Sequence, residues 1–415
     1  MIATTPAPLP APTAEHERIE ALDALRGLAL LGIFLMNVEQ FGAPLVGMEE
    51  GIAPGQAWPD RVADAFVYVF VRSKFWTLFS LLFGMGFAAM LARAEARGAA
   101  FAPLYLRRSV ALLAIGLAHA LLVWSGDILV NYALAALLLL SLRRLPDSAL
   151  WPAGASLYGA VIALGVLGAL AVGALGALGA VPADPAAEAG EAALRQAEIE
   201  AYRHGGYAEA TAMRLRYFLQ MFWLNLALLP MVLGMFLIGA WFVRSGAIRD
   251  PAAHARLFRR LLWIGGPLGL AVTLASFALD PSPQTGGRPD ARALLASTLH
   301  MAAAPAMALA YLAMAMLALQ RGARWLRALA PAGRMALSNY LLQSLLGTWL
   351  FYGHGLGLWG EVGRAWQVAG VAAVFALQVA ASRAWLARFR YGPVEWLWRG
   401  FTYGALPPMR RAAAR

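Results

Sequence analysis

Long apolar stretches separated by short polar segments dominate the chain. Several of these stretches exceed the ~20 apolar residues that a helix needs to cross a ~30 Å hydrocarbon core. Because backbone groups in lipid must bond within their own segment, the stretches predict helices rather than strands. We therefore predict an all-α, polytopic transmembrane helix bundle. Its expected spans number about ten, at residues 24–41, 74–92, 109–124, 128–142, 151–181, 220–243, 261–279, 294–319, 335–352 and 365–385.

Polar segments divide this pattern into five parts. Residues 1–17 are polar and proline-rich without the basic start of a secretory signal, so we expect a disordered cytoplasmic tail. Residues 18–181 and 220–390 each hold five spans, and paired five-span halves are found in many secondary transporters. Between the halves, residues 182–219 are expected to form an outer loop with an amphipathic helix. Residues 391–415 are expected to form a cytoplasmic, interfacial tail.

Composition and charge strengthen the membrane assignment. The chain is 60% hydrophobic and 14% charged, whereas about a quarter of a soluble domain is charged. The net charge is +11, and most arginines fall in segments on one side of the membrane if the amino terminus is cytoplasmic. This follows the positive-inside rule, so both termini are predicted to be cytoplasmic and nucleic acid is not an expected partner. The chain has no cysteine, which excludes disulfides and thiolate metal sites.

The first span carries polar side chains that a plain membrane anchor does not need. Arg26 and Asn37 are eleven residues apart, which returns them to one helix face about 16 Å apart along the axis. Asp23 precedes them and Glu39 follows. Either this face lines a cavity, or Arg26 is a topology signal and Asn37 holds neighbouring helices together.

A histidine and an aspartate flank the turn between the third and fourth spans. His119 lies just before the turn, and Asp127 opens the next helix, where a carboxylate is favoured. The two side chains could meet across this hairpin, and a carboxylate that orients a histidine is a common way to build a general base. The alternative is that Asp127 only caps the helix and His119 bonds a backbone carbonyl.

Two further groups of polar residues are candidates to line a cavity. Lys74, near the outer boundary of the second span, either reaches the surface or pairs with Glu39. His300 belongs to a set of titratable groups expected on the outer side. Histidine spacings typical of metal sites do not occur, so no metal is predicted.

The ninth span carries two amides and a tyrosine. Asn339 and Gln343 are four residues apart and therefore share one helix face, with Tyr340 beside them. Two amides on one face of a membrane helix line either an interface between helices or a cavity.

Five motifs of a known family occur in order along the chain: LDALRGLALLGIFLMN, SKFWTLFSLLFGMGFA, GLAHALLVWSGDILVNYAL, GRMALSNYLLQS and YGPVEWLWR. With them the chain resembles the bacterial YeiB-like family of inner-membrane proteins, whose C-terminal half is a domain of unknown function. The resemblance covers nearly the whole chain and implies a multi-pass protein of the bacterial inner membrane. The family is in turn similar to transmembrane acyltransferases, which include the acyltransferase-3 proteins and heparan-alpha-glucosaminide N-acetyltransferase.

That wider group takes an acyl group from cytosolic acyl-CoA and passes it to a sugar hydroxyl or amine across the membrane. Acyltransferase-3 proteins carry Arg, ten residues and then His in the first span, and here these positions are Arg26 and Asn37. Residues 38–60 contain no histidine. His119 oriented by Asp127 is therefore the candidate base, and Asn37 is the candidate donor to an oxyanion. The candidates to bind the CoA phosphates are Arg26, Arg107, Arg108 and Arg334.

Three functions fit these observations. The first is a membrane acyltransferase that uses acetyl-CoA or another acyl-CoA for a small-molecule, glycan or lipid acceptor at the outer face. The second is a secondary transporter or lipid flippase, and the third is a non-catalytic membrane subunit or sensor. Membrane lipids are expected partners, and the sequence does not decide whether the protein forms a homodimer. The residues expected to line the substrate cavity are Asp23, Glu39, Lys74, Asn339, Tyr340, Gln343 and His300.

Overall fold

The structure is a computed structural model that describes residues 19–47, 51–52, 55–179, 185–283 and 290–411. Within these residues the chain consists of helices and connecting turns, and β pairing is limited to one isolated bridge between Phe389 and Arg410. The helices are α1 (Glu20–Phe41), α2 (Trp58–Phe66), α3 (Lys74–Ala96), α4 (Phe101–Leu122), α5 (Leu129–Ser141), α6 (Asp147–Ala177), α7 (Pro185–Ile199), α8 (Tyr207–Ala227), α9 (Leu229–Arg244), α10 (Ala255–Arg260), α11 (Gly266–Leu279), α12 (Ala291–Gln320), α13 (Arg324–Arg327), α14 (Ala330–Arg334), α15 (Ala336–Phe351), α16 (Arg364–Arg388) and α17 (Pro393–Tyr403). Single π-helical turns, η2 (Val67–Val71), η3 (Glu200–His204) and η4 (Leu261–Gly265), adjoin α2, α7 and α10.

The predicted all-α transmembrane bundle is confirmed. In the described ranges seven helical segments are long and apolar enough to cross a membrane, and the pair α8 and α9 raises the number to as many as eight. Each of the ten predicted spans coincides with helix. However, α5 has 13 residues and α15 has 16, which is shorter than the ~20 that a full crossing needs.

The span predicted at residues 220–243 is broken in the structure. Helices α8 and α9 meet at Leu228 with a bend of 51° between them. Pro230 lies in the first turn of α9, where its missing N–H is tolerated but where it cannot continue the helix before it. The sequence pattern therefore predicted the apolar length correctly and missed the bend.

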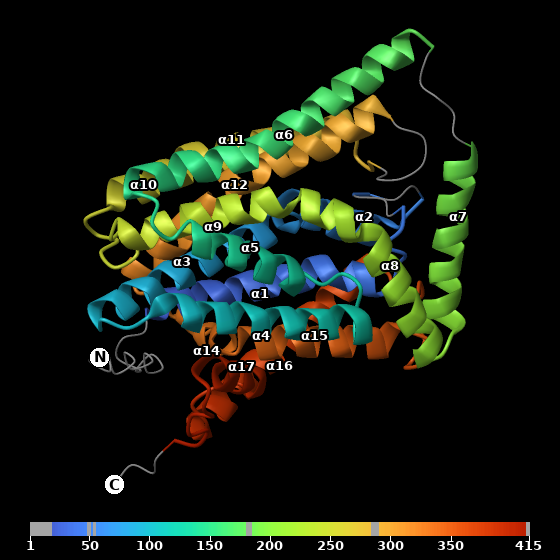
Figure 1. The fold of residues 1–415 in the computed structure, drawn as a ribbon. Helices are drawn as coiled ribbons and strands as arrows, with labels where there is room; N and C mark the ends of the chain where they lie inside the picture. Colours follow the sequence, from blue (N-terminus) through green and yellow to red (C-terminus); the bar gives the residue numbers. More distant parts are fainter. Residues whose placement is uncertain (1–18, 48–50, 53–54, 180–184, 284–289, 412–415) are drawn as a thin grey trace, which may run out of the picture.

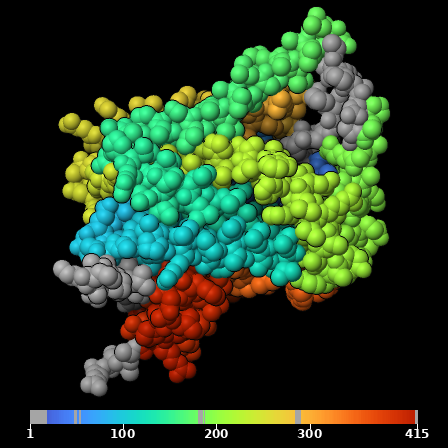
Figure 2. Space-filling model, viewed as in Figure 1, coloured from blue at the N-terminus to red at the C-terminus, as the bar shows by residue number. Residues whose placement is uncertain are grey.

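Most of the long helices run side by side, and Figure 1 shows α1, α3, α4, α5, α9 and α12 in this arrangement. The contact between α3 and α9 depends on two glycines that allow close approach of the backbones. A Cβ on Gly84 would collide with the carbonyl oxygen of Phe236, and a Cβ on Gly239 would collide with that of Leu81. Figure 2 shows α6 on the surface of the molecule, where its exposed leucines suit contact with lipid.

The two ends of the bundle differ in what they carry. The start of α1 and helix α17 lie at one end, which we call the proximal end, and α7 and α8 cover the opposite, distal end (Figure 1). The single amphipathic helix expected in residues 182–219 is instead divided between α7 and α8 at Gly205 and Gly206. Glu198 of α7 is buried and accepts hydrogen bonds of 3.0 Å from the amides of Leu45 and Val46. Burial raises the pKa of this carboxyl group.

Candidate functional site

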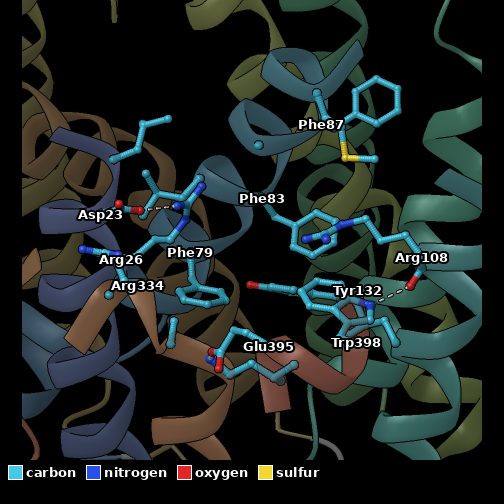
Figure 3. A pocket seen from close by; sticks show the side chains of 18 of the residues that line it. Asp23, Arg26, Phe79, Phe83, Phe87, Arg108, Tyr132, Arg334, Glu395 and Trp398 are labelled. Carbon is cyan, nitrogen blue, oxygen red and sulfur yellow. Dashed lines mark hydrogen bonds and ion pairs between the residues drawn. The ribbon is translucent and has the colours of Figure 1, made fainter. Parts of the chain in front are cut away.

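A cavity of about 250 Å³ lies inside the bundle, between α1, α3, α4, α15 and α17. It extends from polar residues at the proximal end toward an apolar, aromatic interior, which Figure 3 shows from close by. Because its lining combines charged and aromatic side chains from several helices, it is the described pocket best suited to hold an amphiphilic ligand.

Positive charge gathers where the cavity meets the proximal end. Figure 3 shows Arg26 and Arg334 on one side of the cavity and Arg108 on the opposite side. Two carboxylates, Asp23 and Glu395, accompany these arginines, and Arg26 Nη1 donates a 2.7 Å hydrogen bond to Asp23. The arginines that line the cavity are Arg26, Arg93, Arg108, Arg334 and Arg399. An excess of positive charge in a concave site attracts anionic ligands.

Helix α17, expected to be part of an interfacial tail, forms a wall of this cavity. The Arg108 guanidinium lies 3.6 Å from the ring centre of Trp398, whose indole N–H donates a 2.8 Å bond to the Arg108 carbonyl. Glu395 accepts hydrogen bonds from the amides of Leu337 (2.8 Å) and Ser338 (3.1 Å) at the start of α15. Burial raises the pKa of Glu395. These contacts fix α17 against both α4 and α15.

The cavity interior is lined by aromatic rings. Phe79, Phe83 and Phe87 follow one another at intervals of four residues on α3, so they project from the same face. Tyr132 of α5 packs against Phe79 and Phe83, with ring centres 5.9 and 5.6 Å apart (Figure 3). Such a lining suits an apolar chain.

The predicted pairing of His119 and Asp127 is present. His119 Nδ1–H donates a 2.7 Å hydrogen bond to Asp127 Oδ1, and both side chains are buried. The second carboxylate oxygen accepts a 2.8 Å bond from the Val130 amide, so Asp127 also caps the start of α5. Asp127 therefore both pairs with His119 and caps α5, whereas His119 bonds this carboxylate and not a backbone carbonyl. His119 Nε2 is buried and has no hydrogen-bond partner among the described residues.

Tyr340 separates this pair from the cavity. Its ring lines the cavity and packs against the imidazole of His119, with ring centres 5.2 Å apart, whereas His119 itself is not part of the lining. Arg108 and His119 are eleven residues apart on α4, or about 16 Å along the axis. The pair thus lies well beyond the level of Arg108, behind the Tyr340 ring.

Asn37 lies eleven residues beyond Arg26 on α1, just as His119 lies eleven residues beyond Arg108 on α4. Arg26, Leu30 and Ile33 line the cavity along one face of α1, and Asn37 follows on that face one turn further. Asn37 is buried but does not itself line the cavity. The face expected from the spacing of Arg26 and Asn37 is therefore the face that turns toward the cavity.

The amides of α15 face another helix instead of the cavity. Asn339 Nδ2 donates a 3.0 Å bond to Ser382 Oγ, and Gln343 Nε2 donates a 2.9 Å bond to Gln378 Oε1. Both acceptors belong to α16, so this face holds α15 and α16 together. Arg107 is exposed and lies outside the cavity lining.

The remaining predicted cavity residues belong to a separate cluster, in which Lys74 and His300 are buried and Glu39 is partly exposed. Lys74 is fully buried with its Nζ 3.1 Å from Nε2 of His300. The Glu39 carboxylate lies 3.3 Å from Arg364, which also donates to Asp64. No cluster of three or more potential metal ligands occurs in the described part of the chain.

Sequence reasoning did not single out the aromatic lining or the α17 wall. The repeat of Phe79, Phe83 and Phe87 was a usable signal, because a stripe at intervals of four marks one helix face. The contact of Trp398 with Arg108 joins residues 290 positions apart, so no local sequence pattern could predict it.

The fold and the site define a multi-pass membrane protein with a basic, aromatic cavity within its helices. Sequence comparison then gives its family. The chain is 32% identical over 420 residues to "Uncharacterized protein YxaH" of Bacillus subtilis (strain 168), which covers 96% of this chain and 98% of that relative. It is 33% identical over 410 residues to "Uncharacterized protein YeiB" of Escherichia coli (strain K12), with 94% and 98% covered.

The C-terminal part of the chain matches a family model as well. The model described as "Protein of unknown function (DUF418)" matches residues 242–405. The chain therefore belongs to the YeiB-like family, as the five motifs predicted. No solved structure matches it.

Proposed function

We propose that the protein is an acyltransferase of the bacterial inner membrane. It takes an acyl group from acyl-CoA on the cytoplasmic side and passes it to an acceptor at the outer face. One observation carries the proposal: an arginine-lined cavity leads through aromatic rings to Tyr340, and the pair of His119 and Asp127 packs directly behind that ring. In this proposal the proximal end faces the cytoplasm.

The cavity offers what each part of an acyl-CoA needs. The phosphates bind arginines such as Arg26 and Arg108, because guanidinium groups form charge-assisted, bidentate bonds with phosphate oxygens. The thioester arm and the acyl chain lie along the rings of Phe79 and Phe83, which are apolar. The ligand therefore enters with its charged end at the arginines and its reactive end toward Tyr340.

The chemistry follows from the hydrogen bonds of His119. With Nδ1–H donated to Asp127, the lone pair is on Nε2, which accepts the proton of the acceptor hydroxyl or amine. The acceptor atom attacks the thioester carbon, the carbon–sulfur bond breaks, and the proton passes to the CoA sulfur. Asn37 donates to the oxyanion that forms. The Tyr340 ring has to turn aside before substrate reaches the imidazole, so it acts as a gate.

Ligand binding tests the proposal without knowledge of the acceptor. Acetyl-CoA and a longer acyl-CoA should raise the unfolding temperature of the purified protein, because a ligand that binds only the folded state stabilises it. The variant Arg108→Gln should bind roughly 10- to 150-fold more weakly, since a hydrogen bond to a charged group contributes about 1.5–3 kcal/mol.

Arg107→Gln is the matched control, because this neighbouring arginine is exposed and outside the cavity. It should bind acyl-CoA like the wild type. The proposal fails if no acyl-CoA stabilises the wild-type protein, or if Arg107→Gln and Arg108→Gln weaken binding equally. Unfolding temperatures without ligand establish that both variants are folded.

A secondary transporter or lipid flippase is the second candidate, and the bent pair of α8 and α9 favours it. Discontinuous helices are common at the substrate sites of secondary transporters. Because the chain has no cysteine, single cysteines at Phe83 and Asn225 can be labelled without background. Labelling of each cysteine from both sides of a sealed vesicle, changed by substrate, would favour transport over acyl transfer.

A further inference from the structure

Arg214 of α8 is a buried cation with unsatisfied donors. Its side chain is fully buried, and Nη1 donates to the Leu122 carbonyl (2.9 Å) and to Thr211 Oγ1 (3.2 Å). The other two nitrogens, Nε and Nη2, are buried and have no hydrogen-bond partner. Arg214 forms no ion pair with any residue in the described ranges. Arg216, two residues further on, is exposed, so burial is specific to this position.

Burying an unpaired charge costs free energy. This cost is explained if an anion that is not part of the protein pairs with Arg214. Removing an ion from water carries a penalty of several kcal/mol, which a counter-charge has to offset. Proteins therefore bury arginines almost always with a carboxylate, a phosphate or another anion beside them.

The two unsatisfied nitrogens identify the shape of the missing partner. Nε and Nη2 form one edge of the planar guanidinium, from which two N–H groups point in parallel. This edge fits two oxygens of one carboxylate or phosphate group.

A chain of ring contacts links Arg214 to two residues that carry further unsatisfied polar atoms. The Tyr207 ring lies 5.2 Å below the Arg214 guanidinium and packs edge-on against His354, which packs in turn against Tyr352. The Tyr352 hydroxyl and His354 Nδ1 are buried and have no hydrogen-bond partner in the part of the chain that the structure describes. Burial and the charge of Arg214 lower the pKa of His354.

We propose that Arg214, with Tyr352 and His354, is a binding site for the carboxylate or phosphate group of a ligand that reaches the distal end. The site lies close to the pair of His119 and Asp127. Arg214 binds the carbonyl of Leu122, which is three residues beyond His119 on α4.

If the protein is an acyltransferase as proposed, the anion site also indicates the chemical class of the acyl acceptor. The acceptor is then a hydroxyl or amine compound that carries an anionic group, held by Arg214 while its nucleophile meets His119. This step rests on the proposed acyl transfer, whereas the anion site does not.

Thermal unfolding of the purified, full-length protein tests the site. Phosphate and acetate are titrated at constant ionic strength against chloride, and each should raise the unfolding temperature of the wild type. Arg214→Gln should lose this increase, and Arg216→Gln, the exposed control on the same helix, should keep it. In chloride alone Arg214→Gln should be at least as stable as the wild type, because it removes an unpaired buried charge.

The proposal is overturned if phosphate and acetate have no more effect than chloride, or if Arg214→Gln responds like the wild type. Arg214→Lys, which keeps the charge but lacks the paired N–H edge, guards against misfolding of the glutamine variant. It should respond more weakly than the wild type, and an equal response would refute the assignment of the two nitrogens.

Nanodiscs distinguish a lipid headgroup from a soluble ligand as the source of the anion. If phosphatidylglycerol removes the effect of added phosphate and phosphatidylcholine does not, the headgroup occupies the site. The shift produced by acyl-CoA should be the same in Arg214→Gln as in the wild type. Failure of the anion site and failure of the acyltransferase proposal are therefore separate results.

Discussion

The variant Asp127→Asn separates the two tasks that Asp127 performs. In the wild type one carboxylate oxygen accepts from His119 and the other caps α5 through the Val130 amide. Asparagine keeps one oxygen for the Val130 amide. Its NH₂ group then points toward His119 and needs an acceptor, so the imidazole proton moves from Nδ1 to Nε2. The base proposed for acyl transfer is lost while the cap remains.

The structure allows the sizes of the two effects to be worked out. Asp127→Ala removes both the cap, which contributes about 0.5–2 kcal/mol, and a hydrogen bond to a charged group, which contributes about 1.5–3 kcal/mol. It should therefore cost about 2–5 kcal/mol of stability. Asp127→Asn loses mainly the charge assistance, or about 1–2 kcal/mol. Its rate of acyl transfer should nevertheless fall by roughly 10²- to 10⁴-fold, the usual contribution of a general base.

Release of thiol from acetyl-CoA, with a membrane lipid and glycan extract as acceptor, measures this rate. Because the chain has no cysteine, the protein itself contributes no thiol to the signal. Unfolding temperatures of the same samples measure stability. The reasoning is refuted if Asp127→Asn retains the wild-type rate, or if both variants lose rate only in proportion to their loss of stability.

Two further predictions concern packing and pH. Gly239→Ala should destabilise the protein by about 1–3 kcal/mol, because its methyl group meets the Leu81 carbonyl and forces α3 and α9 apart. Gly370→Ala is the control, because a methyl group at this position contacts no neighbouring atom. Equal unfolding temperatures of the two variants would contradict the close-packing argument. Burial raises the pKa of Glu395 above its ordinary value of 4.5, so folding favours the protonated carboxyl. Its contribution is complete below that value and is lost as pH rises through the folded pKa. Relative to Glu395→Gln, the wild type should therefore lose unfolding temperature as pH rises. An unfolding temperature of the wild type that rises relative to that of Glu395→Gln as pH rises would contradict this.

Local sequence features predicted those parts of the site that depend on one short segment. His119 and Asp127 are eight residues apart around a single turn, so chain geometry alone limits the distance between them. The face shared by Arg26 and Asn37 follows from helix periodicity. These features do not depend on how distant helices pack.

Other parts of the site depend on which helices become neighbours. Asn339 and Gln343 share a face as predicted, but only the presence of Gln378 and Ser382 on α16 determines that this face forms an interface. An amphipathic pattern likewise does not reveal whether the polar side meets solvent or a protein interior. For this reason Arg214, in a segment expected to form an outer loop with an amphipathic helix, was not foreseen as a buried cation.

The short length of helix α5 affects the distance that a transferred group would cover through the protein. Its 13 residues extend about 20 Å, roughly two thirds of the hydrocarbon thickness of a bilayer. A span that begins after the turn at Asp127 therefore ends short of a full crossing. In the proposed acyl transfer, the donor and the acceptor that arrive from opposite compartments would be separated here by less than a full membrane thickness, which would shorten the route without a large domain movement.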